Sequence, residues 1–460
     1  MRLSICLTLL CLSACSAIPN AQQDMADINL PQQWSNLHVK TSQDKAEELI
    51  SERWWTSFED AKLNYAIETA LQKNNSLQQA AYSLQQSLLQ VHSAIGDLFP
   101  SLSANANASS SKSLEGGPSS RHFGSSANIS FQLDVFGKLL KNKDAKQWLA
   151  QASMEDRQSV AMSVSTQTAD LYWQLAHINK KLELSQKNIE AAEQLFKMVE
   201  VKYKYGAAAR MDLLSSEQSI NQQRNTLKSL QHQHEQIKNA LAVMIGEMPQ
   251  IKLDEPQELY DISKFPVLQQ NIPAEVLDNR PDIRAARLRL MADMANVSVR
   301  VRDFFPSLNL GASATMGGSS LSKILSNPQG ALSLGVALPF LNVPDNIINL
   351  KVSQIQYQAD LSAYKNKLYT ALSEVENAHS QYRQLMEQHE LLEKNLQDAR
   401  QIERMRMVRY QNGADSLQDL LNAQTSTRQA EQSLLDNELA LHQNFLTRYN
   451  ALGGKPLVFE

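Results

Sequence analysis

The chain has 460 residues, of which 20% are charged, with a formal net charge of −4 and three cysteines. These values are typical of a polar helical protein, and no basic tract indicates a nucleic-acid partner. Beyond the amino terminus, no apolar run reaches the roughly 20 residues that a membrane-spanning helix needs. If the chain crosses a membrane, we therefore expect it to do so with strands.

The amino terminus predicts export. Arg2 precedes an apolar run from Leu3 to Leu12, which is too short to span a bilayer and indicates a signal peptide over residues 1–14. The run ends in Leu12-Ser13-Ala14-Cys15, which resembles a bacterial lipobox. We expect Cys15 to become the lipidated first residue of the mature chain. The alternative is an ordinary signal peptide that happens to contain Cys15.

Lipidation of Cys15 would leave no cysteine for a disulfide. Cys6 and Cys11 would be removed with the signal, so a disulfide framework is excluded. Ser16 favours sorting to the outer membrane, by resemblance to bacterial lipoproteins. Residues 15–57 are mostly polar, and we predict that they form an extended segment after the anchor.

The first helix is predicted from Phe58 to Asp97. Pro100 then forces the chain into an extended conformation. Along the predicted helix, apolar residues recur at helical spacing, at Ile67, Leu71, Leu77, Ala81, Leu84 and Leu88.

Four segments alternate apolar residues with small or polar ones, at about 100–110, 123–135, 306–316 and 331–341. Strands of about 10 residues with one apolar face are typical of outer-membrane barrels. Two soluble hairpins packed on helices would alternate in the same way and are the alternative. The signal peptide and the lack of a covering segment favour the barrel.

Four strands cannot close a barrel, because the smallest barrels use about eight. Hydrocarbon does not tolerate open strand edges, so we expect the chain to oligomerise. Two copies would supply about eight strands around a filled interior, whereas three would supply about twelve and leave an open lumen. The small residues on the inward face favour three.

Long helical stretches follow both strand pairs, from Gly137 to about Tyr205 and from Val343 to Gln411. Each would reach about 100 Å, whereas the helices 58–97 and 210–247 would reach about 60 Å. Two short helices end to end would nearly match one long helix. A coiled-coil stalk that encloses nothing is the alternative, because heptad spacing links Leu182, Ile189, Phe196 and Tyr203.

The chain contains this arrangement twice. Asp97-Leu98-Phe99-Pro100 returns as Asp303-Phe304-Phe305-Pro306, and the turn sequence that begins at Tyr203 returns at Tyr410. The nearly equal offsets indicate a duplicated unit of roughly 190 residues, far longer than a solenoid repeat. We assign the first repeat, an equatorial linker, the second repeat and a tail to residues 58–248, 249–273, 274–451 and 452–460.

With these features the chain resembles the bacterial outer membrane factors of the TolC type, in the lipoprotein branch with OprM-like and NodT-like efflux proteins. The resemblance covers residues 15–460. It is carried by Trp54-Trp55-x-x-Phe58-x-Asp60, Asn74-Asn75-Ser76-Leu77-Gln78-Gln79-Ala80, Arg280-Pro281-Asp282-Ile283-Arg284-Ala285-Ala286, both Phe-Pro-Ser-Leu junctions, the repeated turns and Ala451-Leu452-Gly453-Gly454.

The resemblance implies a mainly α-helical chain whose duplicated units form, in a homotrimer, one twelve-stranded barrel and a long periplasmic α-helical barrel. It implies a passive exit duct in the outer membrane for a tripartite efflux or type I secretion-like system. The expected partners are a periplasmic adaptor and an inner-membrane pump, and no cofactor is implied beyond the lipid on Cys15. The alternative is a non-conducting, lipid-anchored scaffold or adaptor.

The two turns would form the periplasmic tip that meets the adaptor. Glycines at these turns can supply the φ > 0 that ends a helix. The expected docking residues are Gly206, Ala207, Gly413 and Ala414, and the expected helix-to-strand junction residues are Phe99, Pro100, Phe305 and Pro306.

The resemblance also implies a gate at the tip. Asp419 matches an acidic position that faces the lumen, where a ring of carboxylates would select cations. Asp212 is its counterpart, with a purely structural alternative near a helix amino terminus, and Tyr410 matches a position that holds the tip closed. Two positions depart from the family pattern. Asn422 stands where the family has a second acidic residue, and Asp415 stands where it has a basic gating residue.

A basic contact at the gate would then have to come from elsewhere, and Arg210 is our candidate for it. Nothing in the sequence predicts an enzyme, since no phosphate loop or nucleophile elbow is present. His232 and His234 point apart on a helix and predict no metal site.

Overall fold

The computed structural model describes residues 18–26, 28, 53–249, 254–265, 278–339 and 343–454. The predicted signal peptide, Cys15, most of the leader, part of the equatorial linker and the end of the tail lie outside the described residues. Within those ranges, no helix combines the length and the apolar character needed to cross a membrane. The predicted fold class, mainly helical with two hairpins in one small sheet, is confirmed.

The chain divides into two compact units, and each is assembled from three segments far apart in the sequence. Unit 1 comprises Met1–Asn29, Ala81–Asp156 and Asp282–Lys367, and unit 2 comprises Leu30–Ala80, Arg157–Pro281 and Leu368–Glu460. Both repeats therefore contribute to both units. The long helices α5 (Lys138–Lys204) and α9 (Val343–Gln411) supply residues to each.

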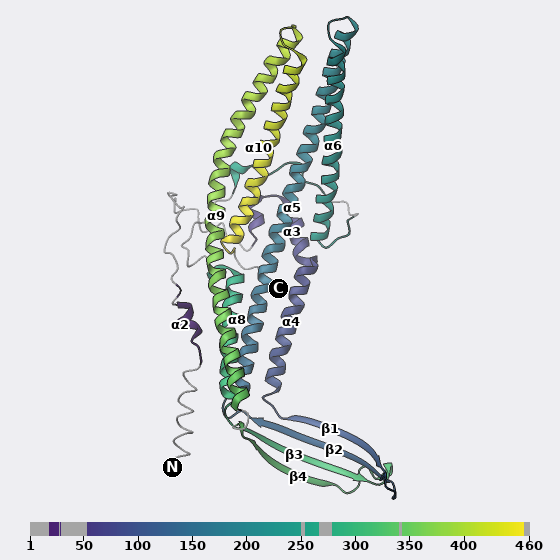
Figure 1. Cartoon of the computed structure of the whole chain (residues 1–460), viewed down its shortest axis with the longest axis vertical. Coiled ribbons are helices and arrows are strands. Elements are labelled where there is room, and N and C mark those ends of the chain that lie inside the picture. Colours follow the sequence, from purple (N-terminus) through teal and green to yellow (C-terminus); the bar gives the residue numbers. More distant parts are fainter. Residues whose placement is uncertain are drawn as a thin grey trace. The chain divides into compact units, whose positions relative to one another are not determined.

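The sheet belongs to unit 1 and is antiparallel throughout, in the order β1-β2-β3-β4 (Figure 1). Its strands are β1 (Ser101–Ser111), β2 (Ser120–Leu133), β3 (Ser307–Gly318) and β4 (Gln329–Ala337). The two repeats meet at its centre, where Leu133 of β2 lies opposite Leu308 of β3. The outer strands β1 and β4 each have one paired edge within the described residues.

Three more helices contribute to unit 1: α2 (Ala21–Ala26), α4 (Asn75–Gly96) and α8 (Pro281–Arg302). The short α2 packs through Ala21 and Met25 against Leu290 and Val297 of α8 and Tyr357 of α9. The Tyr357 hydroxyl also donates a hydrogen bond to the Asp24 carboxylate at 2.5 Å. A piece of the amino-terminal leader is thereby fixed to the helices.

Unit 2 contains α3 (Ala61–Lys73), α6 (Arg210–Met244) and α10 (Leu417–Ala451), with parts of α5 and α9. The helix predicted over 58–97 is in fact two helices. Asn74 has an extended conformation between α3 and α4, and its side-chain oxygen accepts from the amides of Ser76 and Leu77. Its amide donates to the carbonyl of Met244 at 2.9 Å, so Asn74 caps α4 and binds the end of α6.

An aromatic core fixes the remainder of unit 2. The short 3₁₀ helix η1 (Trp54–Phe58) buries Trp54, Trp55 and Phe58. The ring of Phe58 lies 5.2–5.3 Å from those of Trp173 and Phe445, which come from α5 and α10. The Trp-Trp-x-x-Phe motif therefore packs against helices from both repeats. Buried aromatic side chains dominate the energetics of a core, so these contacts stabilise unit 2.

Candidate functional site

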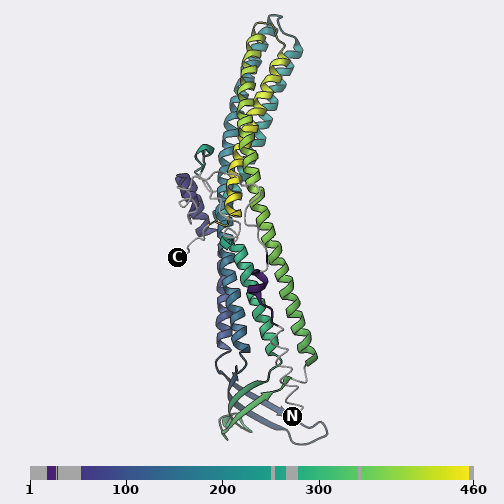
Figure 2. The ribbon, with the colours of Figure 1, turned by 90° about the vertical axis from the view of Figure 1, so that its left-hand side faces the viewer.

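The two predicted turns join α5 to α6 and α9 to α10, and both lie at the same end of unit 2 (Figures 1 and 2). Gly206 has φ of +75° and Gly413 has φ of +71°. In each turn the next amide donates back to a helix carbonyl, Ala207 to Lys202 at 2.7 Å and Ala414 to Arg409 at 2.8 Å. This is glycine-terminated helix geometry, and it leaves the four predicted docking residues exposed.

Asp419 and Asp212 both cap the helix that follows their turn. The amide of Asp419 donates to Ser416 Oγ at 3.1 Å, and that hydroxyl donates to Asp419 Oδ2 at 2.7 Å. The carboxylate of Asp212 accepts from the amide of Ala209 at 3.0 Å, but alanine offers no side-chain oxygen in return. Asp419 is exposed, and its Oδ1 has no hydrogen-bond partner among the described residues.

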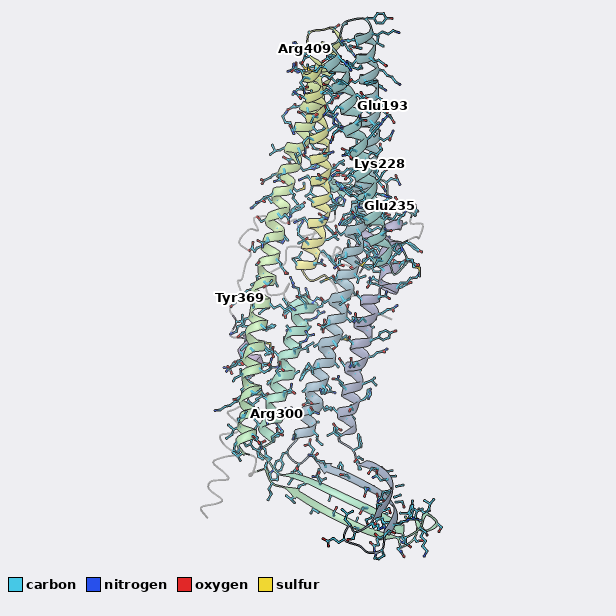
Figure 3. All side chains as sticks on the ribbon, turned by 45° about the vertical axis from the view of Figure 1, so that its right-hand side comes forward. Glu193, Lys228, Glu235, Arg300, Tyr369 and Arg409 are labelled. Atoms are coloured by element: carbon cyan, nitrogen blue, oxygen red, sulfur yellow. The ribbon has the colours of Figure 1, made fainter. Side chains whose placement is uncertain are left out.

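Asp415 is held by two arginines of its own hairpin. Arg406 Nη1 lies 3.0 Å from Asp415 Oδ2, and Arg409 Nε lies 2.8 Å from Asp415 Oδ1. Hydrogen bonding from Arg409, followed by that from Arg406, lowers the pKa of Asp415 despite an opposing effect of burial. Figure 3 shows Arg409 at the tip. The position where the resemblance implies a basic residue is thus occupied by an acid with two local cations.

Lys202 connects the first hairpin to the second. Its Nζ donates to the carbonyl oxygen of Tyr410 at 2.9 Å and lies 4.0 Å from the centre of the Tyr410 ring. The ring is buried in a cluster with Leu195 and Val199 of α5 and Leu417 and Leu420 of α10. Burial, and then the charge of Asp212, raise the pKa of the Tyr410 hydroxyl.

The resemblance predicts a role for Tyr410 but gives no signal for Lys202. Its place in the last turn of α5 marks it only as a cation suited to a helix carboxyl end. Arg210, the candidate for a basic contact, is exposed at the start of α6. Within the described part of the chain it makes no hydrogen bond or ion pair. Lys202 instead reaches the second hairpin at the turns, and Lys181 of α5 pairs with Asp436 of α10 nearer the middle of the helices.

The predicted junction residues lie in unit 1, away from the turns in the chain. Phe305 stacks on Phe136 with ring centres 4.9 Å apart, and Phe305 and Pro306 line a cavity of about 390 Å³. Phe99 and Pro100 are exposed. The two copies of the junction therefore differ, although their sequences are nearly the same.

Among the described residues, no group of three or more histidines, cysteines or carboxylates could hold a metal ion. His234 pairs instead with Glu255, at 2.7 Å between Nε2 and the carboxylate. The arrangement at the turns is one of helix caps, ion pairs, an apolar cluster shared by the two hairpins and the Lys202–Tyr410 contact, which suits a protein interface or a movable closure.

Comparison with known proteins places this geometry in context. The family model described as "Outer membrane efflux protein" matches residues 66–247 and 272–454. The chain is 27% identical to cation efflux system protein CusC of Escherichia coli (strain K12) over 452 residues, 97% of each chain. It is 26% identical to pyoverdine export outer membrane protein OpmQ of Pseudomonas putida over 421 residues, 89% of each.

Solved structures give the same result. A crystal structure of CusC matches with a TM-score of 0.81 and 25% identity, covering 93% of this chain and 97% of that one. The open state of the MtrE outer membrane channel of Neisseria gonorrhoeae matches with a TM-score of 0.80 and 26% identity, covering 93% and 96%. Both matches extend over nearly the whole chain, sheet and helices included.

Proposed function

The chain belongs to the outer membrane efflux protein family, and from this premise we propose that three copies form one passive exit duct with a closable periplasmic tip. The family consists of efflux channels, so the chain is an outer membrane efflux channel and no enzyme. The observation that carries the proposal is the four-stranded sheet with unpaired outer edges, contributed equally by two repeats.

The sheet supports assembly because its apolar residues are uncovered. Leu332, Leu334 and Val336 of β4 are exposed by 89%, 66% and 52%. A soluble monomer rarely exposes such a continuous apolar row, and lipid does not tolerate the open edges of β1 and β4. Pairing β4 of one copy with β1 of the next removes both edges. Three copies then supply about twelve strands, enough for an open lumen.

The docking of α2 supports the proposed lipid anchor at Cys15. Ala21 follows Cys15 by six residues, which span at most about 20 Å when extended. Tyr357, which holds α2, lies 14 residues from Val343, the start of α9 after β4, and this is about 21 Å of helix. Six residues of extended chain would thus be long enough to bring a lipid on Cys15 to the level of the sheet and into the same membrane.

The turns suit the docking of a periplasmic adaptor, with an inner-membrane pump as the source of energy. Gly206, Ala207, Gly413 and Ala414 are exposed and so available to a partner. The relatives are named for different cargoes, cations and pyoverdine among them. We propose that this chain conducts its cargo passively, as the relatives' shared channel architecture suggests, and that the pump selects the cargo.

The contact between Lys202 and Tyr410 is our candidate for the closure of the tip. It joins the ends of the two hairpins of one copy beside their shared apolar cluster, so breaking it would loosen the tip. The free Oδ1 of Asp419 is our candidate for the cation filter, since three such oxygens around a narrow opening would attract cations. The helix cap binds Oδ2 of Asp419 and so orients the carboxylate, while Oδ1 remains available.

Electrophoresis and planar-bilayer recordings test the duct. We expect the full-length, membrane-extracted protein to migrate as a heat-resistant trimer and to give single-channel currents. A monomer that gives no currents at any concentration would instead support the scaffold alternative. Cys15→Ser separates anchoring from assembly: trimers that remain in the membrane through their strands but no longer incorporate labelled lipid are expected, whereas unchanged lipid labelling would refute the anchor at Cys15.

A further inference from the structure

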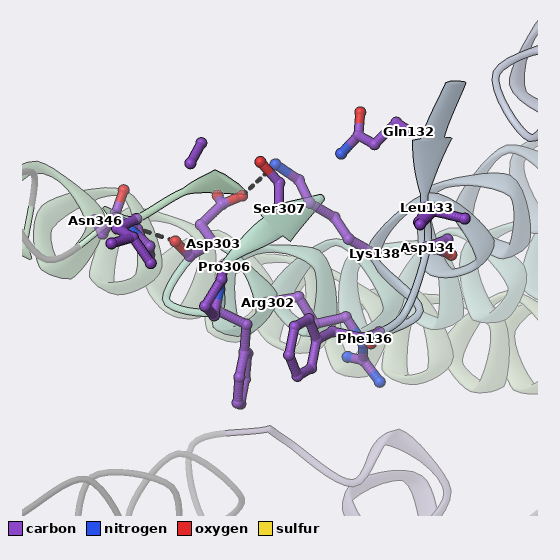
Figure 4. A pocket seen from close by; sticks show the side chains of 14 residues that line it. Gln132, Leu133, Asp134, Phe136, Lys138, Arg302, Asp303, Pro306, Ser307 and Asn346 are labelled. Carbon is purple, nitrogen blue, oxygen red and sulfur yellow. Dashed lines mark hydrogen bonds and ion pairs between the residues drawn. The ribbon is translucent and has the colours of Figure 1, made fainter. Parts of the chain in front are cut away.

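Cavities among the described helices differ in how their polar side chains are bound. In the junction cavity of unit 1, Lys138 Nζ lies 2.6 Å from Asp303 Oδ1, and Asn346 donates to the Asp303 carbonyl at 3.0 Å (Figure 4). The lysine there already has a carboxylate partner. A much smaller cavity, of about 20 Å³, lies in unit 2 between α5, α6 and α10. One of the side chains that line it is a buried hydroxyl without a partner.

This hydroxyl belongs to Ser185 of α5. The residue is 4% exposed, and its Oγ has no hydrogen-bond partner among the described residues. A serine or threonine inside a helix commonly donates to the carbonyl one turn earlier. On the same helix Ser153 and Thr168 do so, to Leu149 at 3.0 Å and to Val164 at 2.7 Å. Buried hydroxyls are nearly always bound to protein or to ordered water, so Ser185 requires a partner from outside the described chain.

The other two helices each bring a polar group to the same cavity. Gln223 of α6 is 8% exposed, and its side-chain amide has no partner in the part of the chain that the structure describes. Arg428 of α10 donates from Nη2 to Thr425 Oγ1 at 3.0 Å and makes no ion pair in the same ranges. Burial lowers the pKa of Arg428. A guanidinium has five N–H donors, so Arg428 can bind an occupant of the cavity as well.

The remaining charged groups of the lining are already paired. Arg400 Nη2 lies 2.8 Å from Glu431 Oε1, and Lys181 Nζ lies 2.7 Å from Asp436 Oδ1. The groups that can bind an occupant are therefore the hydroxyl, the amide and the guanidinium. They come from one helix each, two in the first hairpin and one in the second.

Size and chemistry together identify the occupant. A cavity needs roughly 10–15 Å³ to hold a water molecule, which then makes two to four hydrogen bonds. At about 20 Å³ this cavity fits one water and is too small for a polyatomic anion or an organic ligand. The three available groups include both donors and acceptors. Water can satisfy both kinds, whereas a halide ion would accept from the donors only.

We propose that one water molecule occupies this cavity and bridges Ser185 of the first hairpin to Arg428 of the second, with Gln223 as its third partner. A water-mediated hydrogen bond is nearly as favourable as a direct one. Lys202 lies 17 residues beyond Ser185 on α5, which is about 25 Å of helix. In the proposed duct, on which this step rests, the bridge gives the hairpins a contact that can be remade when the tip opens.

Crystal structures of the full chain that show ordered waters test the site. We expect a water peak at hydrogen-bond distance from Ser185 Oγ and from Gln223 or Arg428. The peak should disappear in Ser185→Val, which replaces the hydroxyl by methyl groups and fills the space. Gln223→Leu, which removes another partner, should weaken the peak. The matched control is Ser229→Val, an exposed serine on α6, which should keep it.

Three crystallographic results would overturn the assignment. These are no peak in wild type, a Ser185 hydroxyl bound to the carbonyl of Lys181, or an anomalous signal at the site in crystals grown with bromide. The last would identify a halide in place of water.

Planar-bilayer recordings of the same variants test the link to opening. We expect Ser185→Val to open less often than wild type at the same conductance, because apolar packing replaces an exchangeable bridge. An open probability equal to that of wild type, with the water lost, would reject the role in opening. Absent currents in wild type would reject the duct, whereas the crystal structures decide the water site by themselves.

Discussion

Lys202 at the end of α5 donates to the carbonyl oxygen of Tyr410 at the end of α9, at 2.9 Å, and its ammonium lies 4.0 Å from the centre of the Tyr410 ring. One side chain thus makes a hydrogen bond and a cation–π contact with one residue. A cation over a partly desolvated ring stabilises by about 0.5–2 kcal/mol. The contact joins the two copies of a duplicated hairpin, and on this ground we propose it as the lock of the tip.

Lys202→Met should weaken this lock while keeping the length and packing of the side chain. We expect a higher open probability or a larger conductance in planar bilayers than wild type. Lys204→Met, an exposed lysine two residues away, is the control. Tyr410→Phe retains both the ring and the carbonyl and should behave as wild type, so a large effect of Tyr410→Phe would contradict the role of the ring and carbonyl.

Asp419→Ala should reduce cation selectivity and block by multivalent cations, because it removes a carboxylate from each copy. The change also costs about 0.3–1 kcal/mol of helix stability. Ser416→Ala separates the two effects, since it removes the capping hydroxyl that accepts from the amide of Asp419 and leaves the charge. Reversal potentials in salt gradients measure the result. If Ser416→Ala changes selectivity as much as Asp419→Ala, the filter role is wrong and capping explains both.

Asp415→Asn should loosen the second turn, since it leaves Arg406 and Arg409 without their carboxylate. The folded-state pKa of Asp415 is lowered, so its contribution is present above the unfolded pKa of about 3.9 and lost as the pH falls through the lower folded value. Hydrogen exchange of the amides over 404–416 should therefore be faster in the variant at pH 7. At a pH below the folded value, the variant and wild type should exchange alike.

Two buried histidines in unit 2 predict sensitivity to mild acid. Burial is the first cause that lowers the pKa of His442 to about 4, and likewise that of His379 to about 4. In the unfolded chain each histidine has a pKa near 6.5, so it binds a proton that the buried histidine of the folded chain does not bind. The free energy of unfolding therefore falls as the pH drops from about 6.5 to 4. Each histidine can cost on the order of 3 kcal/mol over that range.

The measurement is the midpoint of thermal unfolding of the full chain at pH 7.5 and at pH 5. We expect a drop that becomes smaller in His442→Phe, which keeps the ring contacts with Trp173 and Phe265 and removes the titrating group. The exposed His92 supplies the control His92→Phe, whose drop should equal that of wild type. An unchanged drop in His442→Phe would exclude His442 as a source of the acid sensitivity.

Two glycines with the same backbone conformation should respond differently to alanine. Gly246 has φ of +73°, and a Cβ there would lie 2.5 Å from the carbonyl oxygen of Lys73, whereas Gly206 has φ of +75° and nothing within 4 Å. Gly206→Ala should cost about 1–2 kcal/mol for the left-handed backbone. Gly246→Ala should cost clearly more, because the helix end must also move away from Lys73. Equal midpoints in denaturant unfolding would contradict this difference.

The sequence by itself determined the repeated elements, because these depend on residues close in the chain. Alternation with period two gives the four strands, and Gly206 and Gly413 supply the positive φ that ends each long helix. The local sequence also contains a signal for the break at Asn74, because Asn74-Asn75-Ser76 is typical of a helix start. The apolar stripe that continues across this position predicted a single helix instead.

Only the tertiary structure decided which side chains meet. Asp415 could have faced a neighbouring turn, yet it is bound by Arg406 and Arg409, and Arg280 reaches the carbonyl of Ala451 from the opposite end of its repeat. Lys202 and Tyr410 meet because α5 and α9 end side by side. Contacts of this kind depend on how helices distant in sequence pack against each other, and local conformational preference carries no record of that packing.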